Sequence, residues 1–131
     1  EEKREPAPEF KKHEEKVIVA AREEVSDVYM SHEIEEYLIQ LVMATREPQR
    51  YSAELAKYIG YGVSPRGTIA LDICSRGAAW LSGRDYVMPE DVHSIVYDVL
   101  RHRLLPSFEA KAVGITSDKI IKELLQRVPM V

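Results

Sequence analysis

The hexapeptide Gly-Val-Ser-Pro-Arg-Gly at residues 62–67 decides how the second half of this chain is interpreted, because it has the composition of a helix start. Ser64 is a favoured N-cap residue, whose hydroxyl can accept a hydrogen bond from a free backbone N–H of the first turn. Pro65 suits the first helical position, which needs no N–H and benefits from a fixed φ. The sequence therefore predicts a helix that begins at Ser64 and runs to about Ser82.

Arg66 falls in the first turn of that helix, where the helix dipole disfavours a cation by up to about 1 kcal/mol. Free backbone N–H groups and a guanidinium at one helix start would suit an external anion such as a phosphate. The alternative is an ordinary surface arginine, directed into water or paired with a nearby carboxylate. The residues alone favour the ordinary role slightly and leave the anion site open.

Apolar residues recur at helical spacing in further segments of the chain. Helices are predicted over about residues 9–25, from Ser31 to Arg46, from Pro89 to the basic run at 101–103, and from Thr116 or Ser117 to Pro129. Ser52 predicts the start of a short helix that Gly60 ends. The helix at 64–82 is predicted to bury a stripe made of Ile69, Ala70, Ile73, Cys74, Gly77, Ala78 and Leu81.

Two short β-prone runs, residues 28–30 and 86–88, each come directly before a predicted helix. Their similar size suggests that they pair with each other. The predicted fold class is therefore all-α: a compact bundle of about five helices, with a tiny two-stranded pairing of 28–30 with 86–88.

Composition limits the classes of function. The chain has 131 residues, 45% apolar and 31% charged, which suits one domain. Its net charge of −4 argues mildly against nucleic-acid binding. It has no apolar run near the roughly 18 residues that span a bilayer, so no membrane partner is expected. The charged start without methionine predicts a fragment of a longer chain without a signal peptide.

Catalytic motifs are missing from the sequence. It has no G-x-x-x-x-G-K-[ST] loop, no G-x-S-x-G and no H-E-x-x-H, and its four histidines have no metal-ligand spacing. We therefore expect no catalytic residue and no metal site in this chain by itself. Cys74, the single cysteine, fits a reducing compartment and is predicted to be a buried, inert thiol on the apolar stripe. The basic run at 101–103 is expected to cap a helix end rather than to contact phosphates.

Three runs of sequence together carry a resemblance to a known family: Gly-Val-Ser-Pro-Arg at 62–66, Gly-Arg-Asp-Tyr-Val-Met-Pro-Glu-Asp-Val at 83–92 and Val-Leu-Arg-His-Arg-Leu at 99–104. In that order they resemble the C-terminal helical lid of MoxR-type AAA+ ATPases. Ala-Thr-Arg at 44–46 and the segment 124–129 are similar to the same family. The resemblance implies that residues 9–131 form an AAA+ helical lid domain, after a linker or disordered end at 1–8.

The resemblance implies a specific role for one residue. Arg66 stands where the family has its sensor 2 arginine, which reaches the γ-phosphate of ATP bound to the P-loop domain, while Ser64 and Pro65 shape the helix start. Whether it would act on the nucleotide of its own subunit or of a neighbour stays open. The cofactors implied are ATP and Mg²⁺ in the parent protein, with none bound by this chain alone.

The resemblance also implies partners and a setting. MoxR-type proteins are cytoplasmic ATPases that work as rings, typically hexamers, and assist the assembly or activation of protein complexes, often with proteins that carry a von Willebrand factor A domain. The P-loop domain of the same chain and the neighbouring subunits would contact the lid. Truncation would leave an apolar rim bare.

Two features keep another interpretation open. Met88 stands where the family usually has Thr, and the P-loop domain with its Walker motifs is absent, so this chain alone should lack ATPase activity. The alternative is a stand-alone helical interaction module or a DNA-binding regulatory module, which a salt-sensitive affinity for DNA would support.

Overall fold

The computed structural model describes residues 14–130 of the chain, so the predicted end at 1–8 and the first residues of the predicted helix at 9–25 lie outside it. The elements occur in the order α1 (Glu15–Ser26), α2 (His32–Arg46), the 3₁₀ helix η1 (Pro48–Arg50), α3 (Ala53–Tyr58), β1 (Ile59–Tyr61), α4 (Arg66–Leu81), α5 (Pro89–Leu100), β2 (Leu105–Pro106), α6 (Phe108–Ala112) and α7 (Ser117–Arg127). The all-α prediction is confirmed, and the five longer helices are those predicted.

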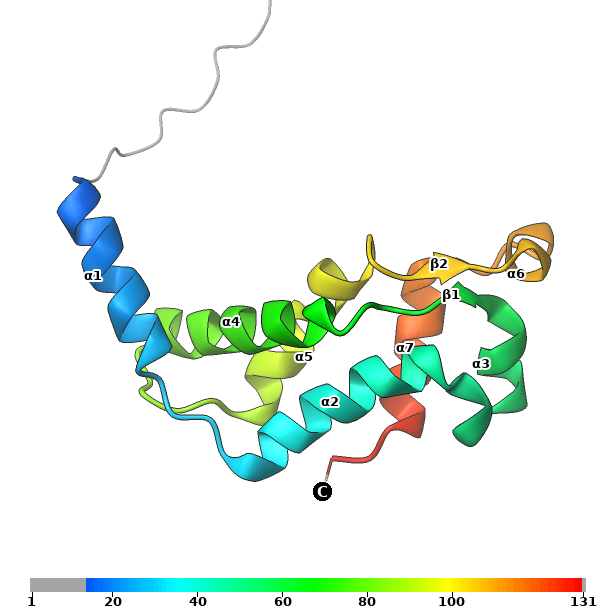
Figure 1. Cartoon of the computed structure of the whole chain (residues 1–131), viewed down its shortest axis with the longest axis horizontal. Coiled ribbons are helices and arrows are strands. Elements are labelled where there is room, and N and C mark those ends of the chain that lie inside the picture. The colour runs from blue at the N-terminus through cyan, green and yellow to red at the C-terminus, as the bar shows by residue number, and fades with distance from the viewer. Residues whose placement is uncertain (1–13, 131) are drawn as a thin grey trace, which may run out of the picture.

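The helices α2, α4 and α5 lie across the middle of the molecule, and α7 runs across the end of α2 (Figure 1). α1 stands out at one end, while α3, α6 and the small sheet form the other. The core joins fully buried side chains from these central helices, among them Leu38, Leu41, Leu71, Leu100 and Leu124. Most of the stability of such helices comes from packing of this kind rather than from helix propensity.

Three predicted helix starts are confirmed by side-chain hydrogen bonds. Ser31 accepts from the N–H of Ile34, Ser52 accepts from the N–H of Leu55, and Thr116 accepts from the N–H of Lys119. In each case a hydroxyl three residues upstream satisfies a donor that has no partner inside the helix.

The buried face of α4 differs from the predicted stripe. α4 buries Gly67, Leu71, Ser75 and Ala79, one residue per turn, against α5 and α2. Ile69, Ile73 and Leu81 are instead 60%, 58% and 80% exposed. The prediction placed the bulkiest apolar residues in the core, but the small side chains face it, because they allow the neighbouring helices to approach closely.

The prediction that Cys74 is a buried thiol is also wrong, because Cys74 is exposed. The cysteine was placed in the core through the same error in the phase of α4. Its position beside Ile73 puts it on the solvent side of the helix, next to the exposed isoleucines.

The predicted pairing of 28–30 with 86–88 is present as a single parallel bridge between Tyr29 and Tyr86. The N–H of Tyr29 donates to the carbonyl of Asp85, and the N–H of Val87 donates to the carbonyl of Tyr29. A separate antiparallel sheet joins β1 to β2 and was not predicted. Gly60 therefore lies in a strand, rather than acting as the cap of α3.

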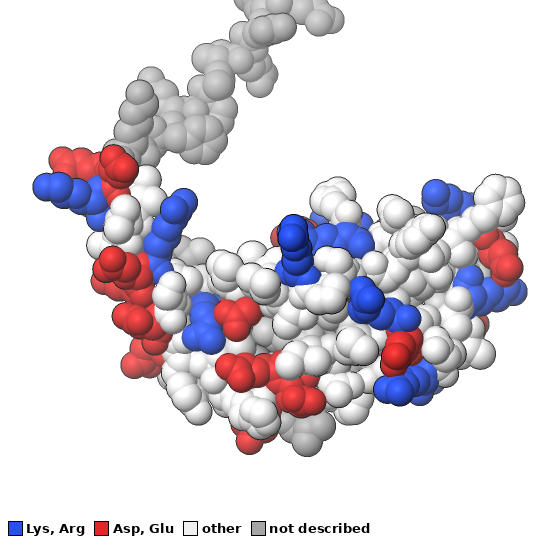
Figure 2. Space-filling view, in the orientation of Figure 1, with Lys and Arg blue, Asp and Glu red and all other residues white. Residues whose placement is uncertain are grey.

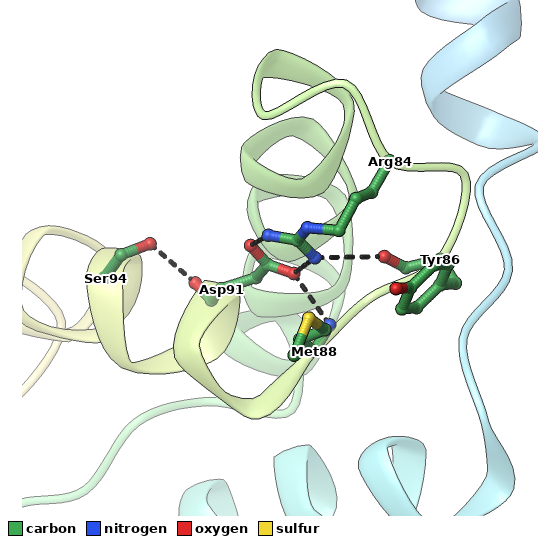
Figure 3. A network of polar contacts seen from close by, with 5 residues as sticks. All are labelled: Arg84, Tyr86, Met88, Asp91 and Ser94. Atoms are coloured by element: carbon green, nitrogen blue, oxygen red, sulfur yellow. Dashed lines mark hydrogen bonds and ion pairs between the residues drawn. The ribbon is translucent and has the colours of Figure 1, made fainter.

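The turn from α4 to α5 is closed by hydrogen bonds at both helix ends (Figure 3). Gly83 has a φ of +78° and ends α4 as predicted, with its N–H donating to the carbonyl of Trp80. Arg84 forms a two-pronged ion pair with Asp91, at 2.6 and 2.7 Å. The same carboxylate accepts from the N–H of Met88 at 2.7 Å, which replaces a side-chain cap at that position.

Candidate functional site

The helix start predicted at residues 62–67 is held against the end of α2. Beyond β1 the chain passes so close to α2 that a Cβ atom on Gly62 would lie 2.3 Å from the carbonyl oxygen of Thr45. The next N–H, that of Val63, donates to the hydroxyl of Thr45 at 2.9 Å. That hydroxyl itself donates to the carbonyl of Val42 at 2.6 Å. The segment before Arg66 is thus fixed by a buried hydrogen-bond chain.

Packing beneath the first turn of α4 adds to this constraint. Val63 is fully buried, and its Cγ1 lies 2.2 Å from where a Cβ on Gly67 would stand. Only a glycine at position 67 leaves room for the Val63 side chain under the helix start. We call Thr45, Gly62, Val63 and Gly67 the platform, since together they determine where Arg66 begins its helix.

The helix start itself differs in detail from the prediction. α4 begins at Arg66, one residue after Pro65, and Ser64 makes no side-chain capping hydrogen bond. The Ser64 carbonyl accepts from the N–H of Gly67 at 2.8 Å, and the Pro65 carbonyl accepts from the N–H of Thr68 at 3.1 Å. Those two N–H groups are therefore not free for an anion. Any anion contact at this helix start has to rely mainly on the guanidinium.

Arg66 has its side chain in solvent. Among the described residues no carboxylate lies within 4.0 Å of its guanidinium, in contrast to the paired arginines 50, 76, 84, 101 and 127. A solvated arginine at the positive end of a helix dipole gains nothing from its position in this domain alone. Of the two ordinary roles considered for Arg66, a side chain directed into water agrees with the structure, and pairing with a carboxylate is not seen among residues 14–130.

A second arginine lies close to the platform. Arg46, the last residue of α2, approaches the carbonyl of Val63 with Nη1 at 3.5 Å. It thus reaches over the backbone three residues before Arg66. The positive field at this end of α4 therefore comes from two guanidinium groups, which would attract an anionic group.

The basic run at 101–103 has the capping role that was predicted. Arg103 donates to the carbonyl of Val99 at 3.0 Å, at the end of α5. Arg101 pairs with Asp98 and with Asp118, and these contacts raise its pKa above the usual value. Arg101 and Arg103 thus serve helix ends.

The described residues contain no cluster of three or more His, Cys, Asp or Glu side chains that could hold a metal ion. Within the same range, no helix combines the length and apolar character needed to cross a membrane.

Comparison with known proteins decides the family. A family described as the AAA lid domain matches residues 52–124, which include the platform glycines and Arg66. This chain belongs to the AAA lid domain family, and its relatives make it a lid of the MoxR type.

Three curated relatives show the type. The chain is 32% identical over 114 residues to the chaperone MoxR1 of Mycobacterium tuberculosis, a match that covers 86% of this chain and 30% of that protein. It is 37% identical over 111 residues to the uncharacterized protein YeaC of Bacillus subtilis, covering 85% of this chain and 32% of YeaC. It is 34% identical over 93 residues to MoxR of Paracoccus denitrificans, covering 66% of this chain and 27% of that protein. The chain thus spans about a third of the length of these relatives.

The fold has a counterpart among solved structures. The crystal structure of a candidate ATPase from Cytophaga hutchinsonii superposes with a TM-score of 0.80 at 41% sequence identity. The superposition covers 83% of this chain and 33% of the other. The lid architecture is therefore shared with a protein about three times as long as the matched region.

The structure also explains what the other sequence runs do. Residues 83–92 build the turn between α4 and α5, so this run holds the two helices in place relative to each other. Thr45 and Gly62 support Arg66, and neither was selected as a site residue. A threonine in an otherwise apolar helical stripe was the available signal, because such a hydroxyl needs a hydrogen-bond partner when buried.

Proposed function

We propose that this lid supplies Arg66 as a sensor 2 arginine to ATP bound on a P-loop domain of the parent protein. The observation that carries the proposal is a solvent-exposed guanidinium, without an ion-pair partner among residues 14–130, on a platform fixed by hydrogen bonds and packing at the start of α4. A guanidinium is always charged and offers several donors in a fixed fork, which suits the oxygens of a terminal phosphate.

The platform couples the position of Arg66 to the position of α4. Because Gly62, Val63 and Gly67 allow little movement of the backbone before α4, a pull on Arg66 would move α4 as a unit, and α5 with it. A contact made to ATP and lost after hydrolysis would then shift the lid between two positions. Differential contact of this kind is what a nucleotide needs to bias a conformational equilibrium.

A binding experiment on the full-length parent tests the contact. We expect Arg66→Ala to weaken ATP binding by about 10- to 150-fold, the equivalent of a charged hydrogen bond of about 1.5–3 kcal/mol, and to leave ADP binding nearly unchanged. Titration with the two nucleotides measures both constants. Arg66→Lys should recover part of the loss, since it keeps the charge without the planar fork.

The control is Arg50→Ala. Arg50 is also exposed, but it pairs with Glu47 at 3.0 Å and lies in η1, away from the platform. If Arg66→Ala weakens ATP and ADP binding equally, or weakens neither, the preference of the protein for ATP is unchanged. That result would exclude Arg66 as a contact to the terminal phosphate.

The proposed role of the whole parent protein is based on its relatives. One relative is named a chaperone MoxR1, and we propose that the parent of this lid is a cytoplasmic ATPase that couples ATP hydrolysis, with Mg²⁺, to the assembly or activation of other protein complexes. In this account the lid contacts the P-loop domain of its own chain and neighbouring subunits of a hexameric ring. Proteins with a von Willebrand factor A domain are the proposed partners.

A further inference from the structure

Arg46 lies beside the start of α4, although it belongs to another helix than Arg66. It is the last residue of α2, and a Cβ atom on Gly62 would lie 3.0 Å from its Cα. From there the side chain follows the backbone forward, because Nη1 comes within 3.5 Å of the Val63 carbonyl oxygen. Three Cα–Cα steps of about 3.8 Å lead from Val63 to Arg66, so these two Cα atoms are at most about 11 Å apart. The two exposed arginines thus start from neighbouring points of one surface.

No carboxylate of residues 14–130 forms an ion pair with Arg46. The acid next to it in the sequence, Glu47, pairs with Arg50 at 3.0 Å instead. The carboxyl end of a helix favours a cation, which explains an arginine at the end of α2 but not its place beside a second arginine. Two neighbouring guanidinium groups repel each other. The lid therefore holds positive charge here that an external anion can neutralise.

The distribution of charge over this face of the molecule agrees with an anion site. Asp and Glu side chains gather along α1 and below α4, while basic side chains stand over the end of α2 and the start of α4 (Figure 2). Such a local field attracts an anion to this part of the lid. A nucleic acid is a poor candidate for that anion, because the whole chain has a net charge of −4.

The two arginines are suited to different groups of one polyphosphate chain. The contact with the Val63 carbonyl keeps the Arg46 guanidinium behind the first turn of α4, whereas Arg66 lies in that turn. In the proposed function Arg66 reaches the terminal phosphate of ATP. Since the polyphosphate ends there, an arginine at another place along it can meet only a phosphate nearer to the nucleoside.

We infer that Arg46 is a second nucleotide-binding arginine of this lid, and that it contacts a phosphate that ADP carries as well as ATP. The inference rests on the proposed function, which brings the nucleotide to Arg66. The present contact of Arg46, a neutral carbonyl at 3.5 Å, is long for a hydrogen bond. A charged phosphate oxygen is the stronger acceptor, and the guanidinium can turn to it. Arg66 then distinguishes ATP from ADP, while Arg46 binds both.

Nucleotide titrations of the full-length parent test the inference. Arg46→Ala should weaken the binding of ATP and of ADP by about 10-fold or more, which corresponds to one lost charged hydrogen bond, and should leave the ratio of the two constants unchanged. Arg50→Ala is the matched control, because Arg50 is also exposed but is neutralised by Glu47. It should bind both nucleotides normally. An affinity for ADP that Arg46→Ala leaves unchanged would overturn the inference.

Two further variants separate a phosphate contact from a structural role of Arg46. Arg46→Gln keeps an N–H donor for the Val63 carbonyl but has no charge, while Arg46→Lys keeps the charge without the planar fork. If Arg46 binds phosphate, the lysine variant should retain more of the affinity for ADP than the glutamine variant, and salt should reduce the difference. Equal affinities of these two variants would mean that Arg46 only supports the backbone, and would overturn the inference.

The second contact and the sensor role fail separately. If Arg66→Ala leaves the preference for ATP over ADP unchanged, the sensor role of Arg66 is excluded. If Arg66→Ala removes that preference but Arg46→Ala leaves the binding of ADP unchanged, only the contact of Arg46 is excluded.

Discussion

One carboxylate, that of Asp91, holds the turn between α4 and α5. It is 4% exposed and accepts two hydrogen bonds from Arg84 and one from the N–H of Met88. The bond from Arg84 is the main reason that the pKa of Asp91 lies below its usual value of 3.8. A carboxyl with a lowered folded-state pKa stabilises the fold above its unfolded pKa and loses that contribution as the pH falls through the folded value.

Asp91→Asn should therefore lower the free energy of unfolding at pH 7 by at least about 1 kcal/mol, as for other lost helix caps. It should also flatten the loss of stability below about pH 4, since the variant has no carboxyl to protonate there. Urea unfolding at a series of pH values measures both effects. Asp98→Asn on the same helix, where the carboxylate is 79% exposed, is the control. If the free energy of unfolding of Asp91→Asn falls at acid pH as steeply as that of the unmodified chain, this role for Asp91 is contradicted.

Thr45 fixes the backbone that leads to Arg66 by accepting a hydrogen bond from the N–H of Val63. Thr45→Val keeps the shape of the side chain but removes the acceptor for the N–H of Val63, and an unsatisfied buried donor costs about 1–3 kcal/mol. We expect a loss of stability in that range in urea unfolding, together with a weaker preference of the full-length parent for ATP over ADP. Thr45→Ser, which keeps the hydroxyl, should retain most of the stability and most of the preference for ATP over ADP. A fully stable Thr45→Val variant would show that the platform does not depend on this bond.

Residue types alone were sufficient to predict the caps at Ser31, Ser52 and Thr116, because each cap acts within four residues of sequence. The same reasoning failed at Ser64, where tertiary contacts from Thr45 and Gly62 determine the path of the chain. Arg66 was selected from its local misfit with the helix dipole. The anchor of the chain before Arg66 is the bond from Val63 to Thr45, which lies 18 positions earlier and is beyond the reach of local patterns.

At the scale of elements, α4 shows the limit of hydrophobic periodicity. Its buried line of Gly67, Leu71, Ser75 and Ala79 has a lower apolar content than its exposed line, which contains Ile69 and Ile73. Periodicity identifies an apolar face but does not say whether that face packs inside the domain or against another one. In α2, α5 and α7, by contrast, the single apolar face is the buried face.

Ser75 provides a test of the observed phase. Its hydroxyl is fully buried and has no hydrogen-bond partner among the described residues. Ser75→Ala should stabilise the chain by about 0.5–1 kcal/mol, because alanine has the higher helix propensity and buries no unsatisfied hydroxyl. Thermal unfolding followed by circular dichroism measures the change, with Ser82→Ala at the exposed end of α4 as the control. A destabilised variant would mean that the Ser75 hydroxyl has a partner.

The pairing of β1 with β2 was missed for a related reason. The two strands have three and two residues and lie more than 40 positions apart. Segments this short carry no alternating pattern from which a strand can be predicted. The bridge between Tyr29 and Tyr86 was predicted because both runs precede helices and are rich in β-prone residues.

At the scale of the whole molecule, the lid has two differently built sides. One side is closed, with a core of central helices and satisfied helix ends. The other carries Arg66, the exposed isoleucines of α4 and a groove between α1 and α4. A large exposed apolar surface is typical of an interface. This side of the lid is thus suited to contact with another domain or chain.

The most direct test of the central claim is the ATP turnover of the full-length parent protein, with and without Arg66→Ala, at saturating nucleotide and with folding checked by circular dichroism. The account predicts a fall in turnover of about 10-fold or more, since the transition state would lose a charged donor to the phosphate. Arg50→Ala should retain the normal rate. Normal turnover in the folded Arg66→Ala protein would contradict the claim that this lid senses the nucleotide.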